Sequence, residues 1–152
     1  MAVAEAVVPT DRAGVPKIRK DRNGLQVLDR VTCLVLLGQA PVGRIAYVAS
    51  GRARVVPVNI ALREGEVLFR VGTGGLLDAI ADRQWLTLEA DEFDAEARCG
   101  WSVVVTGNPH EVMSRPDESR PAMRSWLRPE AGRLVRLALQ EISGRRLAPA
   151  MD

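Results

Sequence analysis

The sequence has few of the residues that usually carry chemistry. Among its 152 residues it has one histidine, His110, and two cysteines, Cys33 and Cys99. A zinc site needs more such ligands, and a hydrolase triad needs a Gly-x-Ser-x-Gly elbow that is missing here. The cysteines form no CxxC pair, so we expect two buried free thiols, and His110 in a surface or half-buried structural role. Any reaction would therefore depend on a bound cofactor, with the fold supplying orientation and electrostatics.

Lysine is scarce too, since Lys17 and Lys20 are the only two in the chain. Nearly all cations of the folded part are therefore arginines, which suit bidentate contacts with phosphate or carboxylate groups. The 21 basic and 19 acidic residues leave a net charge of +2. This near balance does not support nucleic acid as the main partner, because such proteins carry a strongly basic face.

Long apolar runs are also missing. No run approaches the ~18 residues of a membrane span, and Glu5 stands where a signal peptide would carry a basic residue. We therefore expect a cytoplasmic protein with no membrane partner. Prolines and a glycine break residues 1–24, which predicts a flexible N-terminal extension. Residues 25–152 are then one folded domain, and at 47% hydrophobic the chain can bury a core.

The apolar pattern predicts one helix followed by strands. Leu28, Val31 and Val35 recur at helical spacing, which predicts a helix over about 28–37. Alternating apolar residues then predict strands over 43–49, 54–62, 67–71, 85–90 and 101–106. Pro57 lies inside the second of these strands and cannot donate a ladder hydrogen bond, so it predicts an edge or a bulge.

Three segments are less clear from the pattern alone. Residues 91–96 carry four acids, which predicts a solvated loop rather than a cation site, because the spaced glycine of a calcium loop is missing. Residues 116–128 predict a helical connector around Trp126. Residues 130–142 fit both a strand and a helix, and the residue types favour a helix.

A glycine-rich loop, Gly72-Thr73-Gly74-Gly75, separates the 67–71 strand from a short predicted helix over 76–82. One interpretation is a phosphate cradle, because open N–H groups before a helix attract anions. The other is a tight turn that needs glycine only for its geometry, and spacing alone favours it. The loop matches neither the dinucleotide fingerprint nor a P-loop, since no lysine follows it.

The order of these features has a parallel in a known family. The segments that carry it are Pro41–Ala46, Val55–Asn59, Leu68–Arg70, the glycine loop, Gly100–Gly107 and Ile142–Arg146. Together they resemble the pyridoxamine 5′-phosphate oxidase-like family of flavin-binding split β-barrels, over roughly residues 27–146. The resemblance implies a mainly β fold, a six-stranded antiparallel split barrel with a few short helices, in which 130–142 is a strand. It also implies a homodimer with FMN in a groove at the dimer interface, and a small-molecule substrate or ligand.

The resemblance further implies where a flavin would lie. The strand 54–59 matches the one along the flavin ring, Arg70 and Val71 match the strand beside the ribityl chain and phosphate, and Trp126 is similar to a tryptophan that covers the ring. The cofactor-binding residues so implied are Arg54, Val58, Asn59, Arg70, Val71, Thr73, Gly74, Gly75 and Trp126. No catalytic side chain and no metal ligand is nominated.

The chain departs from the family pattern at two positions of the loop. Gly75 stands where the family usually has Ser or Thr, and Leu76 stands where it usually has the phosphate-binding Lys. Thr73, Arg54 and Arg70 could replace these contacts in part. Three outcomes stay open: weak FMN binding, a related cofactor such as a deazaflavin, or no cofactor. The protein is then either a flavin-dependent oxidoreductase of unknown substrate or a split barrel acting as a binding module.

The departure at Leu76 leads to an expectation for the purified protein. We expect it to carry FMN substoichiometrically or not at all, and we expect Leu76→Lys to raise FMN affinity in a salt-dependent way. The alternative is that Leu76 is the first core residue of the short helix, in which case lysine would destabilise the fold. No segment matches the family's substrate-phosphate site near the C-terminus, so oxidation of pyridoxamine phosphate itself is not expected.

Overall fold

The computed structural model describes residues 18–112 and 132–149. Two helices and nine strands lie within these ranges. In chain order they are β1 (Gln26–Leu28), α1 (Arg30–Gln39), β2 (Val42–Ala49), β3 (Arg52–Arg63), β4 (Glu66–Val71), α2 (Gly75–Ala81), β5 (Leu86–Asp94), β6 (Cys99–Gly107), β7 (Pro109–Glu111), β8 (Arg133–Ala138) and β9 (Glu141–Leu147).

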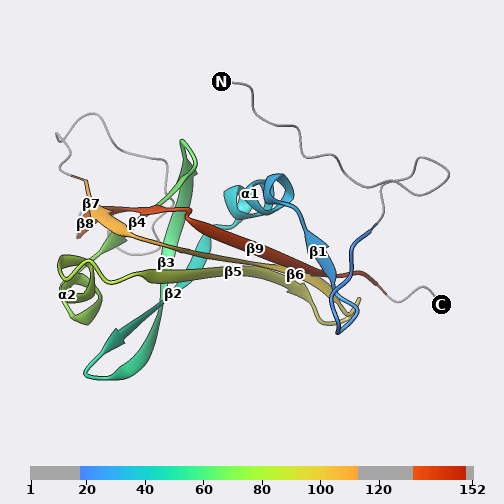
Figure 1. Ribbon diagram of the computed structural model, residues 1–152, viewed down its shortest axis with the longest axis horizontal. Coiled ribbons are helices and arrows are strands. Elements are labelled where there is room, and N and C mark those ends of the chain that lie inside the picture. Colours follow the sequence, from blue (N-terminus) through green and yellow to red (C-terminus); the bar gives the residue numbers. More distant parts are fainter. Residues whose placement is uncertain (1–17, 113–131, 150–152) are drawn as a thin grey trace.

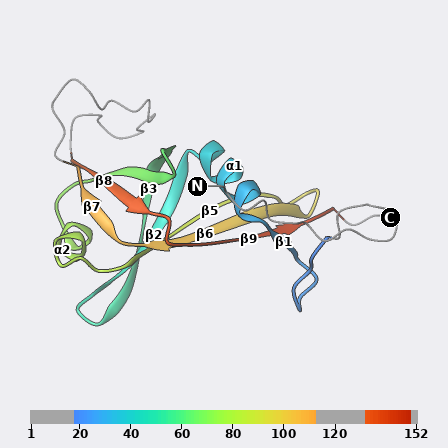
Figure 2. The same cartoon turned by 45° about the horizontal axis from the view of Figure 1, so that its top comes forward.

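The strands form one antiparallel sheet in the order β1-β9-β6-β5-β2-β3-β4-β8-β7. Figure 1 shows this sheet curling, with α1 lying beside β9 and β1 and with α2 at the opposite end of the sheet. Helix α1 contacts β9, β3 and β6, whereas α2 contacts β2 and β7. A hairpin of β2 and β3 projects past the rest of the sheet on the α2 side in both views (Figures 1 and 2).

The mainly β, antiparallel fold is confirmed, but the predicted number of six strands is too small. Strands β1 and β7 have three residues each, too short for an alternation to be visible in the sequence. The segment 130–142, predicted as one strand, contains β8 and the start of β9, with a break at Leu139 and Gln140. The family resemblance was therefore right about strand structure there and wrong about its continuity.

The acidic segment 91–96 is also different from the prediction. Strand β5 continues through Asp94, whose partner on β6 is Cys99, and only the following residues form the turn. The Asp94 side chain accepts hydrogen bonds from the N–H groups of Glu96 and Ala97, so it stabilises this turn. The acids look like a loop by composition, but the ladder with β6 decides the structure.

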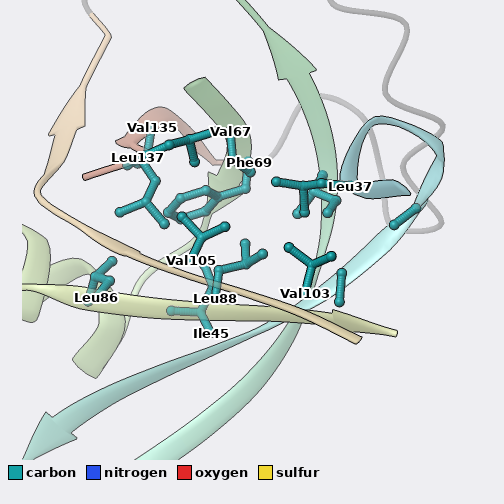
Figure 3. Close-up of a cluster of buried hydrophobic side chains, with 14 of the residues drawn as sticks. Leu37, Ile45, Val67, Phe69, Leu86, Leu88, Val103, Val105, Val135 and Leu137 are labelled. Carbon is teal, nitrogen blue, oxygen red and sulfur yellow. The ribbon is translucent and has the colours of Figure 1, made fainter. Parts of the chain in front are cut away.

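The core lies on the concave face of the curled sheet. Its largest fully buried side chains include those labelled in Figure 3: Leu37, Ile45, Val67, Phe69, Leu86, Leu88, Val103, Val105, Val135 and Leu137. They come from strands of both halves of the sheet and from α1, so this one cluster holds the two halves together. Burial of each such side chain contributes about 1.5–3 kcal/mol.

Helix α1 exists where the sequence predicts a helix, but it buries another face. Val31 and Val35 are 71% and 54% exposed, whereas Cys33, Leu36 and Leu37 are buried. The N-cap is Asp29, whose carboxylate accepts from the Thr32 N–H at 2.8 Å, and this bond holds the pKa of the carboxyl below its usual value. Both cysteines are free thiols, as expected. Cys33 is buried, but Cys99 is only half-buried, so the prediction of two buried thiols is wrong for Cys99.

The described end of the predicted N-terminal extension touches the domain. Lys20 forms a β-bridge with Gln26, and Asp21 Oδ2 accepts from Arg145 Nε at 2.9 Å. This bond lowers the pKa of the Asp21 carboxyl. The boundary at residue 24 stays a prediction, because residues 1–17 lie outside the described ranges.

Candidate functional site

Strands β3 and β4 part in the middle of the sheet. Their pairing runs from Arg63 and Glu66 to Ile60 and Phe69 and ends there. The first part of β3, residues 52–59, pairs with β2 alone within the described chain. One side of this segment is thus an open strand edge, and Pro57 lies in it, as its missing N–H predicts. The end of β4 leads instead into the glycine loop.

The glycine loop leaves its main chain accessible. A Cβ placed on Gly72 or Gly74 would meet no atom within 4 Å. Gly74 has φ 128°, a conformation that side-chain-bearing residues rarely adopt, and its carbonyl accepts the first helical bonds of α2 from Leu77 and Asp78. Thr73 is exposed between these two glycines. The loop therefore serves as a turn geometrically, and its open surface is compatible with a bound anion.

Gly75 packs against the β2–β3 hairpin. A Cβ on it would lie 3.4 Å from Cε2 and from the hydroxyl oxygen of Tyr47, and 3.7 Å from Cβ of Ala49. Tyr47 is paired with Arg54 across β2 and β3. Directly paired residues share a face of the sheet, so Arg54 projects from the face that carries Tyr47 and meets α2. The Arg54 side chain is exposed there.

The other predicted cofactor residues are engaged elsewhere. Arg70 Nη1 donates to the Gly132 carbonyl at 3.3 Å, and Val71 is buried in the core with 6% exposure. Val58 is half-buried against the core, and Asn59 Nδ2 donates to the Pro41 carbonyl at 3.3 Å. Trp126 lies outside the described residues. The structure thus places Arg54 on the face of the hairpin whose Tyr47 meets Gly75, whereas Arg70 donates to the Gly132 carbonyl.

Leu76 turns toward the core. It is 7% exposed and belongs to the main hydrophobic cluster, together with Ala79 and Ile80 of the same helix. This agrees with the alternative that Leu76 is the first core residue of α2. The side chain at position 76, directly after the loop, therefore supplies no positive charge to a bound phosphate.

Gln84 connects α2 to the hairpin, a contact that no sequence pattern signalled. The Val48 N–H donates to Gln84 Oε1 at 2.5 Å, and Gln84 Nε2 donates to the Val48 carbonyl at 3.0 Å. The side-chain amide thus makes the two hydrogen bonds with Val48 that a strand paired with β2 would make, just before β5 begins. These two bonds fix the end of α2 against β2.

The convex face of the sheet carries a charged cluster of its own. Arg44 Nη1 contacts Glu89 Oε2 at 3.1 Å and Asp91 Oδ1 at 3.0 Å. Burial, and then the charge of Asp91, raise the pKa of the Glu89 carboxyl above its usual value despite the arginine. No sequence pattern signals this cluster, because Arg44 and the two acids are more than forty residues apart and only the β2–β5 register joins them.

A separate hollow of about 410 Å³ lies between α2 and β7. Its walls include Leu77, Ile80, Pro109, His110 and Arg133. His110 is 53% exposed, and its Nε2 lies 3.4 Å from Glu66 Oε1, so it lies at the surface. None of the predicted cofactor residues that the structure describes lines this hollow. In the described part of the chain, no group of three or more His, Cys, Asp or Glu side chains is arranged to hold a metal ion, and no helix there could span a membrane.

The curled antiparallel sheet, parted between β3 and β4, defines the protein as a split β-barrel. The family model described as pyridoxamine 5′-phosphate oxidase matches residues 29–146. The chain therefore belongs to this family, as the order of its sequence segments indicates.

Similar proteins include two mycobacterial proteins and one from Mesorhizobium loti. An uncharacterized protein of Mycobacterium tuberculosis is 27% identical over 128 residues, which cover 79% of this chain and 84% of that protein. The FAD-binding protein from Mycobacterium smegmatis is 27% identical, with 81% of this chain and 98% of that one covered and a TM-score of 0.62. A FAD-binding protein from Mesorhizobium loti has a TM-score of 0.69 over 82% and 99% of the two chains, and at 21% identity it supports the fold alone.

Proposed function

We propose that this protein binds a flavin nucleotide and acts as a flavin-dependent oxidoreductase. The observation that carries the proposal is the parting of β3 from β4, which leaves the edge of residues 52–59 open beside the glycine loop. Membership of the pyridoxamine 5′-phosphate oxidase family supports it, as does the similarity to a mycobacterial FAD-binding protein.

The residues present fit such a group. Main-chain groups on the free edge of β3 suit the hydrogen-bonding rim of a flavin ring, while Thr73 and the open glycines suit a phosphate. Arg54 adds a cation on the face that meets α2, and it has no ion pair within the described chain. Arg70 is the weaker candidate, because it already donates to Gly132.

The bound flavin would supply hydride or electron transfer. This chain's own residues would bind it, orient it and exclude water. The half-buried Val56 and Val58, on the face of β3 that packs on the core, give an apolar surface beside the open edge. No side chain of the chain is assigned a proton-transfer role, and the substrate is left unassigned.

A second candidate function is a split barrel that binds a deazaflavin, or no cofactor, and acts as a binding module. The specific observation in its favour is Leu76, whose side chain is buried where the family pattern has a phosphate-binding lysine. FMN itself would then bind weakly. The two candidates differ in which cofactor the open loop accepts.

Cofactor binding separates these candidates directly. We expect the purified protein to bind added flavin, with FMN substoichiometric as isolated, and we expect Arg54→Ala to weaken FMN binding by about tenfold, from ~1.5–3 kcal/mol for a charged hydrogen bond. Absorption spectra and fluorescence titrations with FMN, FAD and a deazaflavin measure this. A colourless protein that binds none of the three would contradict the proposed function, and an unchanged dissociation constant would remove Arg54 from the site.

We further propose a homodimer formed through the convex face of the sheet. No described element covers this face, although large apolar side chains lie exposed on it. On the alternation of the strands they are Val48, Val55, Trp85, Phe93 and Leu147. A contiguous exposed apolar patch on a monomer often marks a protein–protein interaction site. An obligate dimer of this kind would bury on the order of 2,000 Å² or more in total.

Sedimentation at micromolar concentration tests the dimer. We expect the unmodified protein to be dimeric and Val55→Glu to shift it toward monomer, because the substitution puts a charge into an apolar contact. Val35→Glu is the matched control, since Val35 is a similarly exposed valine on α1 that faces away from the proposed interface. A monomeric unmodified protein would count against the dimer, as would equal effects of the two variants.

A further inference from the structure

The space beside Gly75 is occupied by a hydroxyl from another strand. The family pattern has Ser or Thr at this position, which would project a hydroxyl from its Cβ. Here the Cβ site lies 3.4 Å from the Tyr47 hydroxyl oxygen. The Tyr47 hydroxyl is therefore in van der Waals contact with the place where the Cβ of the family's Ser or Thr would lie.

The Tyr47 side chain is held in place, and its hydroxyl is available for a hydrogen bond. The ring packs against the hydrophobic cluster, which restricts its rotamer. Within residues 18–112 and 132–149 the hydroxyl makes no hydrogen bond, and no buried side-chain polar atom there lacks a partner, so the hydroxyl is open to solvent. An ordered donor that is solvated and unpaired is suited to a polar ligand.

Two arginines of β3 share the face of the hairpin that carries Tyr47. Arg54 pairs with Tyr47, and Arg52 pairs with Ala49, whose Cβ is also in reach of Gly75. Residues two apart on a strand are ~6.5–7 Å apart and point the same way. Both guanidinium groups are exposed and, in the part of the chain that the structure describes, neither has an ion pair or hydrogen bond. Two unneutralised cations thus project from the face of the hairpin that carries the Tyr47 hydroxyl.

We propose that Tyr47, Arg52 and Arg54 together hold the phosphate of the bound flavin nucleotide, in place of the hydroxyl and the lysine that the family carries in its glycine loop. The inference rests on the proposed flavin binding. It assigns the phosphate contact to the β2–β3 hairpin rather than to the start of α2. Arginine suits this task because its planar group can donate two parallel hydrogen bonds to phosphate oxygens.

The phosphate contact can be isolated by comparing nucleotides with riboflavin, which has the same ring and no phosphate. We expect Tyr47→Phe and Arg52→Ala each to weaken FMN and FAD binding by about five- to tenfold, with riboflavin changed by less than about twofold. The FMN effect of Arg52→Ala should shrink at 0.5 M salt, where the Debye length is ~4–5 Å. Arg63→Ala is the control, since Arg63 is an exposed arginine at the other end of β3.

A gain of function completes the test. In the Tyr47→Phe background, Gly75→Ser restores a hydroxyl at the family position, and we expect it to recover most of the lost FMN affinity. An equal loss for riboflavin and FMN, or no loss for FMN, would overturn the assignment while leaving flavin binding intact. Absence of all flavin binding in the unmodified protein would instead overturn the proposed function, and this assignment with it. Separate FMN and FAD titrations show which nucleotide supplies the phosphate.

Discussion

Replacing Leu76 with lysine is expected to lower the free energy of unfolding by roughly 2–4 kcal/mol, without tightening FMN binding. Leu76 is 7% exposed and packs with Ala79 and Ile80 in the main cluster. A lysine there must either bury its ammonium group or pull the first turn of α2 away from the core. Both costs fall on the fold, and neither brings a cation to the outer surface of the loop.

Chemical denaturation of both forms, with FMN titrations beside it, measures this. Ala81→Lys is the matched control, because Ala81 ends the same helix and is exposed, so it should cost little. The opposite result, a stable Leu76→Lys protein with tighter, salt-sensitive FMN binding, would show that the family lysine site survives in this chain. It would also argue that the hairpin arginines are not needed for the phosphate.

Replacing Gly107 with alanine should be still more damaging, at about 3 kcal/mol or more. The added Cβ would overlap the carbonyl oxygen of Ala138, a backbone atom that cannot rotate away. Gly107 ends β6 and Ala138 ends β8, so this contact joins the two halves of the sheet. Any shift there moves β8, and with it the paired β4 that leads into the glycine loop.

Gly72→Ala provides the comparison, because a Cβ on Gly72 would meet nothing within 4 Å. Thermal melts of the two variants should differ by about 6–12 °C, using ~2–4 °C per kcal/mol for a chain of this size. Similar melting temperatures would mean that β6 and β8 can separate without cost. The close approach at Gly107 would then not be a constraint on the fold.

The fold was predictable wherever local pattern and pairing agree. Strands β2 to β6 are visible in the sequence as alternating apolar residues, and the glycine loop is visible as a break between a strand and a helix. The buried face of α1 was not predictable from spacing. A face with Val31 and Val35 fits a helical period as well as the face with Cys33, Leu36 and Leu37 that is buried. What decides is the sheet: Cys33 fills the space that Gly144 leaves on β9.

The candidate site was predictable in part for the same reason. Its loop and Arg54 lie within matched family segments, so the sequence could point to them. Tyr47 and Arg52 carry no motif. Only the packing of α2 brings Tyr47 to Gly75, and only the register of β2 with β3 puts Arg52 on the same face. Arg70 shows the reverse, since its place in a family segment does not reveal that it donates to Gly132.

The amide of Gln84 has a thermodynamic consequence for any ligand at this end of the molecule. The amide is hydrogen-bonded to both the N–H and the carbonyl of Val48. These bonds hold the β2–β3 hairpin in a fixed position relative to the end of α2. Groups that are already ordered lose little conformational entropy on association, so more of each contact remains as affinity. Selectivity between a nucleotide and its dephosphorylated form would then reflect the preorganisation of the hairpin as much as its charge.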